Sequence, residues 1–462
     1  MNRKDASFGA SFFRSKEEMT RDLTTGAPAK VLWQFSLPLL GSVLFQQMYN
    51  LADSLVAGKL ISVAALSAVG NAYEVTLIYL AFAFGCNIGC SVVLSQLFGA
   101  KKIADLKTAV STNFIFSGAL TVLLMVLGFL LSPALLAAIS VPVELRAETL
   151  KYLNIYTGGL IFLFFYNISN GIFTALGDSK TPFLFLAASS TANVFVDILF
   201  VKLFPHWGTG TVAWATFLCQ GVSCVLSMLA VLRKLRQLQC DKRPRVFDWG
   251  ILRRIIRIAL PSTLQQSFVS VGNIILQRVI NLLGGAVIAG YSAGVKINNF
   301  AITTFTTLGT GVSTYTAQNL GAGKQERVKR GTRAGIVMML VVAVACGAAY
   351  LLLREQLVGL FMKEKGTDAL GIGCRFLVIL APFYPIICIK ICCDGVLRGA
   401  GAMNYFMIAT FTDLVLRVAL ALILSPSLGS DGVWLAWPIG WCIATVMSAV
   451  FYLSGVWKRA HV

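Results

Sequence analysis

Long apolar stretches, separated by short polar breaks, recur along almost the whole chain of 462 residues. Each is at least close to the roughly 20 residues that a helix needs to cross a bilayer. The stretches are continuously apolar and lack the short alternating pattern of a membrane barrel. The pattern therefore predicts an all-α membrane protein whose twelve transmembrane helices lie at 31–58, 64–97, 108–131, 150–176, 182–203, 210–232, 259–283, 286–318, 333–353, 374–397, 404–425 and 432–457.

Composition agrees with this pattern, since 57% of the residues are hydrophobic and 13% are charged. The net charge of +19 would suit a nucleic-acid partner if it were clustered on a soluble face. Instead, 27 of the 39 Lys and Arg residues lie in the two tails and in alternate loops, and the opposite loops hold 8. This bias predicts a multi-pass protein of the plasma (inner) membrane with both termini in the cytoplasm, and no nucleic-acid partner.

The two halves of the chain resemble each other on either side of the basic stretch 233–257, the longest polar segment between spans. We therefore predict a cytoplasmic tail at 1–30, a six-helix lobe at 31–232, a cytoplasmic linker at 233–257, a second lobe at 258–457 and a short tail at 458–462. Each half has an even number of spans, so the two bundles are parallel and related by an axis along the membrane normal. The matched positions are Pro38 with Pro261, the segment 96–102 with 318–324, and Gly171, Ala175 and Gly177 with Gly395, Gly399 and Gly401.

Several kinds of chemistry are excluded by what the sequence lacks. No G-x-x-x-x-G-K-[ST] phosphate loop occurs, because Gly58-Lys59 is followed by Leu60. The chain has two histidines, and its 11 cysteines lie almost entirely within spans, where a free cysteine behaves as a small apolar residue. We therefore expect no enzyme activity, no catalytic residue, no metal site, no disulfide and no cofactor besides a coupling ion.

Acidic residues inside spans are the main candidates for function, because a charge at membrane depth costs about 3 kcal/mol and so needs a purpose or a partner. Asp53 shares one face of the first span with Gln46 and Asn50. In the fifth span Asn193 and Asp197 are spaced i, i+4 and again share a face. We predict that Asp53, Asn193 and Asp197 bind a cation, with Gln46 and Asn50 as a supporting polar face.

This acidic cluster is not repeated in the second half, because Asp53 aligns with Leu276, Asn193 with Arg417 and Asp197 with Ala421. Burial favours the protonated form of a carboxyl group, which makes proton coupling workable. A Na⁺ site would instead use ionised carboxylates and the amide oxygen, since hard cations prefer oxygen ligands. The competing interpretation is that both carboxylates only hydrogen-bond neighbouring helices.

Charged residues also occur in spans of the second half. Lys390 stands four residues before Asp394 and can neutralise it locally. Lys390 and Arg417 remain candidate contacts of the second lobe, either as gating residues or as partners of an anion.

The sequence resembles the bacterial branch of the multidrug and toxic compound extrusion (MATE) family from about residue 29 to 457. The resemblance rests on the segments 45–53 (FQQMYNLAD) and 170–182 (NGIFTALGDSKTP), on Asn193 with Asp197, and on 395–399 (GVLRG). It implies two six-helix lobes and export of amphipathic organic cations in exchange for inward H⁺ or Na⁺. It also implies that Asp53, Asn193 and Asp197 form the cation site of the first lobe.

Some members of that family carry carboxylates in the seventh and tenth spans, whereas this chain has Gln265, Gln266 and Phe268 near the first place and Ile387 near the second. Proton coupling through the first lobe is therefore favoured. We expect a monomer in the lipid bilayer that moves small organic cations by alternating access. The alternative is a flippase of lipid-linked oligosaccharide from the same wider superfamily, which should have a basic cleft for phosphate.

Overall fold

The computed structural model describes residues 22–56, 63–139, 141–240, 242–361 and 368–459, with the side chains of 48–56, 63–66, 74, 138 and 205 outside that description. Within this part of the chain every regular element is helical. The first half contains α2 (Pro28–Val56), α3 (Val63–Gly99), α4 (Ile103–Ala138), α5 (Val143–Gly158), α6 (Leu160–Ala175), α7 (Lys180–Leu203) and α8 (Gly210–Gln237), with a 3-10 turn at Pro205–Trp207.

The second half has a corresponding series of helices and one additional short helix, α12. It contains α9 (Trp249–Asn281), α10 (Gly285–Gly321), α11 (Gln325–Leu352), the short α12 (Arg354–Gly359), α13 (Asp368–Leu380), α14 (Tyr384–Gly399), α15 (Met403–Leu428) and α16 (Ser430–Leu453), with 3-10 turns at Ala381–Phe383 and Val456–Lys458.

Two of the twelve predicted spans are broken rather than continuous. The span at 150–176 is the pair α5 and α6, which bend by 49° at Gly159. The span at 374–397 is α13 and α14, interrupted by the turn at Ala381–Phe383. With each pair counted once, the described residues form twelve helical spans, as the hydrophobic pattern predicts.

Eight of these spans, with α13–α14 taken as one segment, are long and apolar enough to cross a membrane, and the bent pair α5–α6 makes a ninth. The others, α2, α9 and α10, have 29, 33 and 37 residues and so are long enough, but carry more polar side chains. These three helices lie at the junction of the two halves, where polar residues can face the other half instead of lipid.

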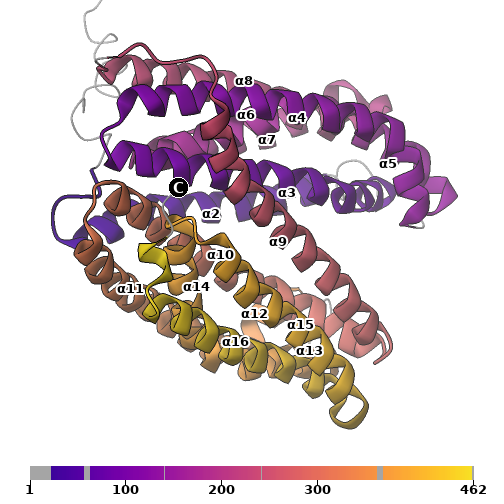
Figure 1. Cartoon of the computed structure of the whole chain (residues 1–462). Helices are drawn as coiled ribbons and strands as arrows, with labels where there is room; N and C mark the ends of the chain where they lie inside the picture. Colours follow the sequence, from indigo (N-terminus) through magenta and orange to yellow (C-terminus); the bar gives the residue numbers. More distant parts are fainter. Residues whose placement is uncertain (1–21, 57–62, 140, 241, 362–367, 460–462) are drawn as a thin grey trace, which may run out of the picture.

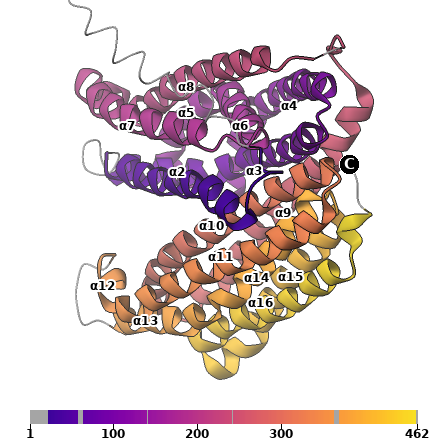
Figure 2. The same cartoon turned by 90° about the vertical axis from the view of Figure 1, so that its left-hand side faces the viewer.

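The halves form two lobes that share an interface, as Figures 1 and 2 show. The first helix of each half reaches across: α2 packs on α10 and α11 of the second half, and α9 packs on α3 and α4 of the first half. Each also packs within its own half, α2 on α7 and α9 on α15. This reciprocal arrangement confirms the two pseudo-symmetric six-helix bundles.

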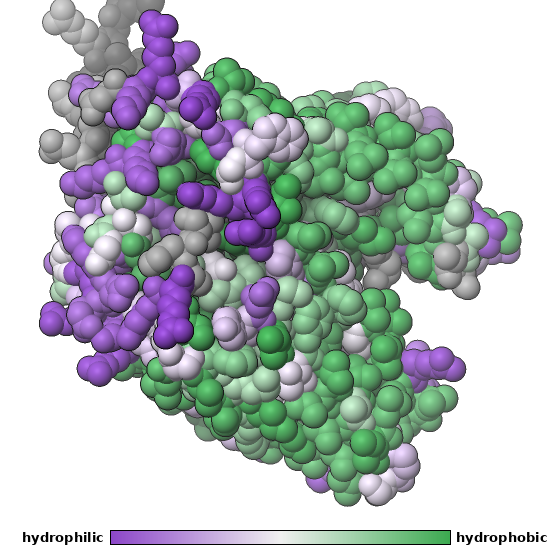
Figure 3. Space-filling view, viewed as in Figure 1, coloured by the Kyte–Doolittle hydropathy of each residue, from purple (hydrophilic) through white to green (hydrophobic). Residues whose placement is uncertain are grey.

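The lobes meet at the end of the molecule that carries the basic loops and separate towards the other end, where Figure 3 shows a hollow between them. The interlobe seam at the basic end consists of the last turns of α3, α6, α10 and α14. There the Gln96 side chain donates to the carbonyl of Gly399 at 3.0 Å, and Gln318 donates to the carbonyl of Ala175 at 2.7 Å. The two bonds are repeat equivalents, so the seam has the same pseudo-twofold symmetry as the lobes.

Glycine makes this seam possible, because the backbones of α3 and α10 touch. A Cβ on Gly99 would overlap the Gln318 carbonyl, and a Cβ on Gly321 would overlap the Gln96 carbonyl. The segment before α2 closes the same end: Leu23 is fully buried, donates its amide to Gln318 Oε1 at 3.0 Å and accepts from Asn319 Nδ2 at 3.2 Å.

Candidate functional site

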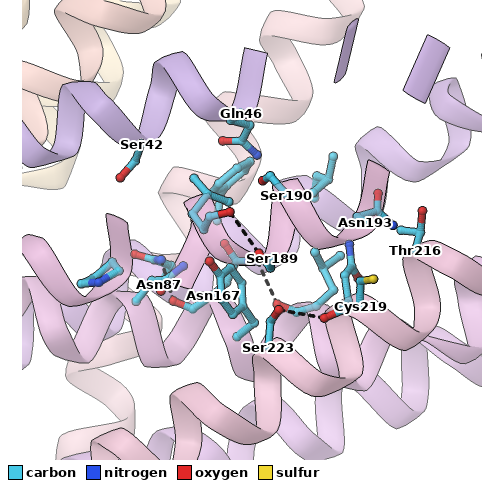
Figure 4. Close-up of a pocket in the computed structure, with 18 of the residues that line it drawn as sticks. Ser42, Gln46, Asn87, Asn167, Ser189, Ser190, Asn193, Thr216, Cys219 and Ser223 are labelled. Atoms are coloured by element: carbon cyan, nitrogen blue, oxygen red, sulfur yellow. Dashed lines mark hydrogen bonds between the residues drawn. The ribbon is translucent and has the colours of Figure 1, made fainter. Parts of the chain in front are cut away.

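A cavity of about 270 Å³ lies inside the first lobe, among α2, α3, α6, α7 and α8. Its wall combines apolar side chains with a large share of amides and hydroxyls, and Figure 4 labels several of these polar side chains, together with Cys219, around one space. Such a wall can hold a small polar group or water inside an otherwise apolar bundle. The polar lining residues include Ser42, Gln46, Asn87, Asn167, Asn170, Thr174, Ser189, Ser190, Asn193, Thr216, Gln220 and Ser223.

Of three amide side chains that line the cavity, two are hydrogen-bonded to the backbone and one is not. The Asn87 side chain donates to the carbonyl of Asn167 at 2.7 Å, and Asn167 Nδ2 donates to the carbonyl of Leu163 at 2.8 Å. The Asn193 side chain is 3% exposed, and its oxygen and nitrogen have no hydrogen-bond partner among the described residues. Since buried amides are nearly always satisfied, Asn193 is the amide best placed to contact a bound ion or water.

Asp197 lies one helical turn beyond Asn193 on the same face of α7 and is fully buried. The apolar residues around it on α7, Phe195 and Leu199, are largely exposed on the opposite, lipid-facing side. The helix is therefore oriented by its apolar face, and this orientation carries both polar side chains into the lobe.

The structure brings some of the predicted site residues together and leaves others untested. Gln46 and Asn193 both line the cavity, and Asp197 is buried next to Asn193. Asn50 and Asp53 belong to α2, but their side chains lie outside the described residues, so their predicted roles stay predictions.

Lys390 and Arg417 lie inside the second lobe. Each forms an ion pair with an aspartate one turn away on the same helix. Lys390 Nζ is 2.7 Å from Asp394 Oδ2, and Arg417 Nη2 is 2.9 Å from Asp413 Oδ2. The local neutralisation of Asp394 by Lys390 that the spacing predicts is thus present. Arg417 neutralises Asp413 of the same helix in the same way.

Sequence reasoning missed the contributions of α3 and α8 to the cavity, namely Asn87, Gln220 and Ser223. An amide in the middle of a continuous apolar span was the available signal, because such a group must face protein and not lipid. Among the described residues no group of three His, Cys, Asp or Glu side chains could hold a metal ion.

Comparison with known proteins places these features in context. A family model described as MatE matches residues 38–199 and again 261–423. The probable multidrug resistance protein YpnP of Bacillus subtilis is 28% identical over 438 residues, which cover 95% of this chain and 97% of that protein. The probable multidrug resistance protein YoeA of the same organism is 26% identical over 437 residues, covering 93% and 94%.

The fold is also similar to that of solved transporter structures. A MOP superfamily transporter from Pyrococcus furiosus superimposes with a TM-score of 0.88 at 23% sequence identity, covering 96% of this chain and 100% of that one.

Proposed function

Because the chain belongs to the MatE family, a family of membrane transporters and not of enzymes, we propose that it is a secondary active antiporter that exports amphipathic organic cations. The exchanged ion is an inward H⁺ or Na⁺, and the cycle is alternating access between two lobes. In this proposal Asp53, Asn193 and Asp197 hold the coupling cation, while Gln46 and Asn50 extend their polar face.

One observation supports this proposal most directly: α7 buries a carboxylate and an unsatisfied amide one turn apart beside a polar cavity. The equivalent positions of the second lobe are Ala421 and Arg417. A buried carboxylate attracts a cation and repels an anion. Cation binding in the first lobe is therefore the chemistry that this arrangement favours.

Orientation follows from the charge bias. With the basic end in the cytoplasm, both tails are cytoplasmic and the lobes separate towards the outside of the plasma membrane (Figure 3). A substrate released from the first lobe in this arrangement would leave the cell. Re-entry of the coupling cation from outside would then reset the carrier.

The test uses purified protein in liposomes and follows ethidium under an imposed pH gradient and then under a Na⁺ gradient. Wild-type protein should move ethidium under one of the two gradients, and Asp197→Asn and Asp53→Asn should each lower that rate at least tenfold. Asp431→Asn is the matched control, because Asp431 pairs with Arg375 on the exposed end of α16.

The outcomes separate the candidate functions. Transport under Na⁺ alone would keep the antiporter and identify Na⁺ as the coupling ion. If neither gradient moved ethidium while the protein flipped a lipid-linked oligosaccharide, the flippase alternative would replace the antiporter.

A further inference from the structure

The charged residues of α14 and α15 occupy the repeat positions of the cavity wall in the first lobe. The alignment of Gly171 with Gly395 superimposes α6 on α14 and α7 on α15. The difference in residue number between aligned positions is the same along both pairs of helices. Five uncharged residues of the cavity wall are thereby replaced by all five charged residues of α14 and α15. The pairs are Tyr166 with Lys390, Asn170 with Asp394, Thr174 with Arg398, Ser189 with Asp413 and Asn193 with Arg417.

On α14 these charges compensate each other inside the lobe. Lys390 and Asp394 are 5% and 6% exposed, and their charged atoms are 2.7 Å apart. The second carboxylate oxygen of Asp394 accepts from Ser448 Oγ of α16 at 2.6 Å. Both oxygens of this carboxylate are therefore occupied by the chain itself.

On α15 the second pair has the same i, i+4 spacing. Arg417 Nη2 donates to Asp413 Oδ2 at 2.9 Å, and its guanidinium stacks 4.3 Å from the ring centre of Trp437 on α16. Gly440 of α16 lets Asp413 approach closely, since a Cβ there would lie 2.8 Å from Asp413 Oδ1. The guanidinium therefore lies between a carboxylate and the face of an indole ring, and both of these groups stabilise a cation.

Arg398 adds a third cation on the same face of α14. Its guanidinium donates to Thr310 Oγ1 of α10 at 3.3 Å and lies 6.0 Å from the Phe406 ring of α15. On these two helices three cations therefore face two carboxylates. An additional cation would meet net positive charge here, whereas the five equivalent positions in the cavity wall of the first lobe carry no charge.

We propose that Lys390 and Arg417 are built-in cations that take the place of a coupling ion in the second lobe and so determine that coupling uses the first lobe alone. This inference rests on the proposed antiport. An ammonium or guanidinium held one turn from its carboxylate is part of the chain and cannot be released to either side of the membrane. A dissolved cation would have to displace it from a buried carboxylate, and both oxygens of the Asp394 carboxylate are already hydrogen-bonded.

Removal of a built-in cation should accordingly create a second coupling site. The experiment reconstitutes the full chain in liposomes with the voltage clamped at zero and plots the logarithm of the steady-state ethidium ratio against that of the driving-ion ratio. The slope is the number of ions per substrate. We expect Lys390→Met to raise this slope by one, so that a tenfold ion gradient sustains a tenfold larger ethidium gradient.

Three further variants complete the design. Arg417→Asn, which installs the residue of the first lobe, should raise the slope in the same way. Lys390→Met combined with Asp394→Asn should return it to the wild-type value, because the freed carboxylate is gone. Arg375→Met, which breaks the exposed pair with Asp431, should leave the slope unchanged.

The results distinguish this inference from the proposed function. A wild-type slope of zero under both gradients would reject the antiport itself. The wild-type slope could instead be nonzero and the same in folded Lys390→Met and Arg417→Asn. That result would reject the proposal of built-in cations and leave the proposed antiport intact. If neither single variant folds, the test is saturable binding of ²²Na⁺ to the wild type and to Asp197→Asn. The inference requires that Asp197→Asn abolish all ²²Na⁺ binding that the wild type shows. Binding that remains in Asp197→Asn would overturn the inference.

Discussion

The interlobe seam at the basic end allows a quantitative prediction, because the fully buried Gln318 side chain makes two bonds to backbone groups there. It donates to Ala175 O at 2.7 Å and accepts from the Leu23 amide at 3.0 Å. Gln318→Ala would leave both groups buried and unsatisfied, at a cost of about 1–3 kcal/mol each. Opening the seam to water removes this cost, so the variant should favour the open state.

Even the lower end of this range, about 2 kcal/mol in total, changes the ratio of open to closed seam roughly 30-fold. Gln96→Ala should have a smaller effect, since Gln96 is only partly buried and makes one such bond, to Gly399 O at 3.0 Å. A matched control is Gln277→Ala, because the Gln277 side chain bonds to Asn281 on the exposed surface of α9.

The assay is pulsed electron spin resonance between labels at Lys180 and Arg330, which are exposed residues at the start of α7 in the first lobe and of α11 in the second lobe. The Gln318→Ala distance distribution should shift towards longer values, Gln96→Ala should shift less, and Gln277→Ala should match the wild type. Thermal unfolding of each variant shows whether a longer distance reflects a shift between the closed and open seam or a loss of folding stability. An unchanged distance distribution in folded Gln318→Ala would refute the argument that these bonds hold the seam closed.

Three further predictions concern the seam glycine Gly321, the cavity and the start of α9. Gly321→Val should lengthen the same label distance, because its side chain overlaps the Gln96 carbonyl. Asn193→Leu should lower ion-driven ethidium transport at least tenfold while the melting temperature stays near that of the wild type, since the amide it removes has no described partner. Asp248 caps α9 by accepting from the Ile251 amide at 3.0 Å, so Asp248→Ala should cost about 1 kcal/mol in thermal unfolding and Asp248→Asn much less.

The cap at Asp248 also predicts a pH dependence. Hydrogen bonds from the backbone amides of Ile251 and Gly250, with the Arg245 guanidinium, hold the pKa of this carboxyl below its ordinary value of 3.8. A lowered folded-state pKa contributes stability above that ordinary value, and the contribution is lost as the pH falls through the folded pKa. The difference in melting temperature between wild type and Asp248→Ala should therefore be constant near neutral pH and shrink below about pH 4. A difference that grew on acidification would contradict the assignment.

The amino-acid sequence by itself determined the all-helical membrane fold, the twelve spans and the division into two related halves. These features depend on local quantities: an apolar segment of spanning length must form a helix, because lipid offers its backbone no hydrogen-bond partner. The polar faces of Gln46 and of Asn193 with Asp197 could also be predicted, since a helix has a fixed period and lipid excludes buried polar groups.

Only the tertiary structure decided which of these faces share a space. The contributions of Asn87 and Gln220 to the cavity depend on how α3 and α8 pack around α6, and helical periodicity does not contain that information. The breaks at Gly159 and at Ala381–Phe383 are likewise tertiary, since both spans read as continuous in the sequence. The bonds of Gln96 and Gln318 across the seam join residues about 140 to 300 positions apart, so only the packing of one lobe against the other could bring them together.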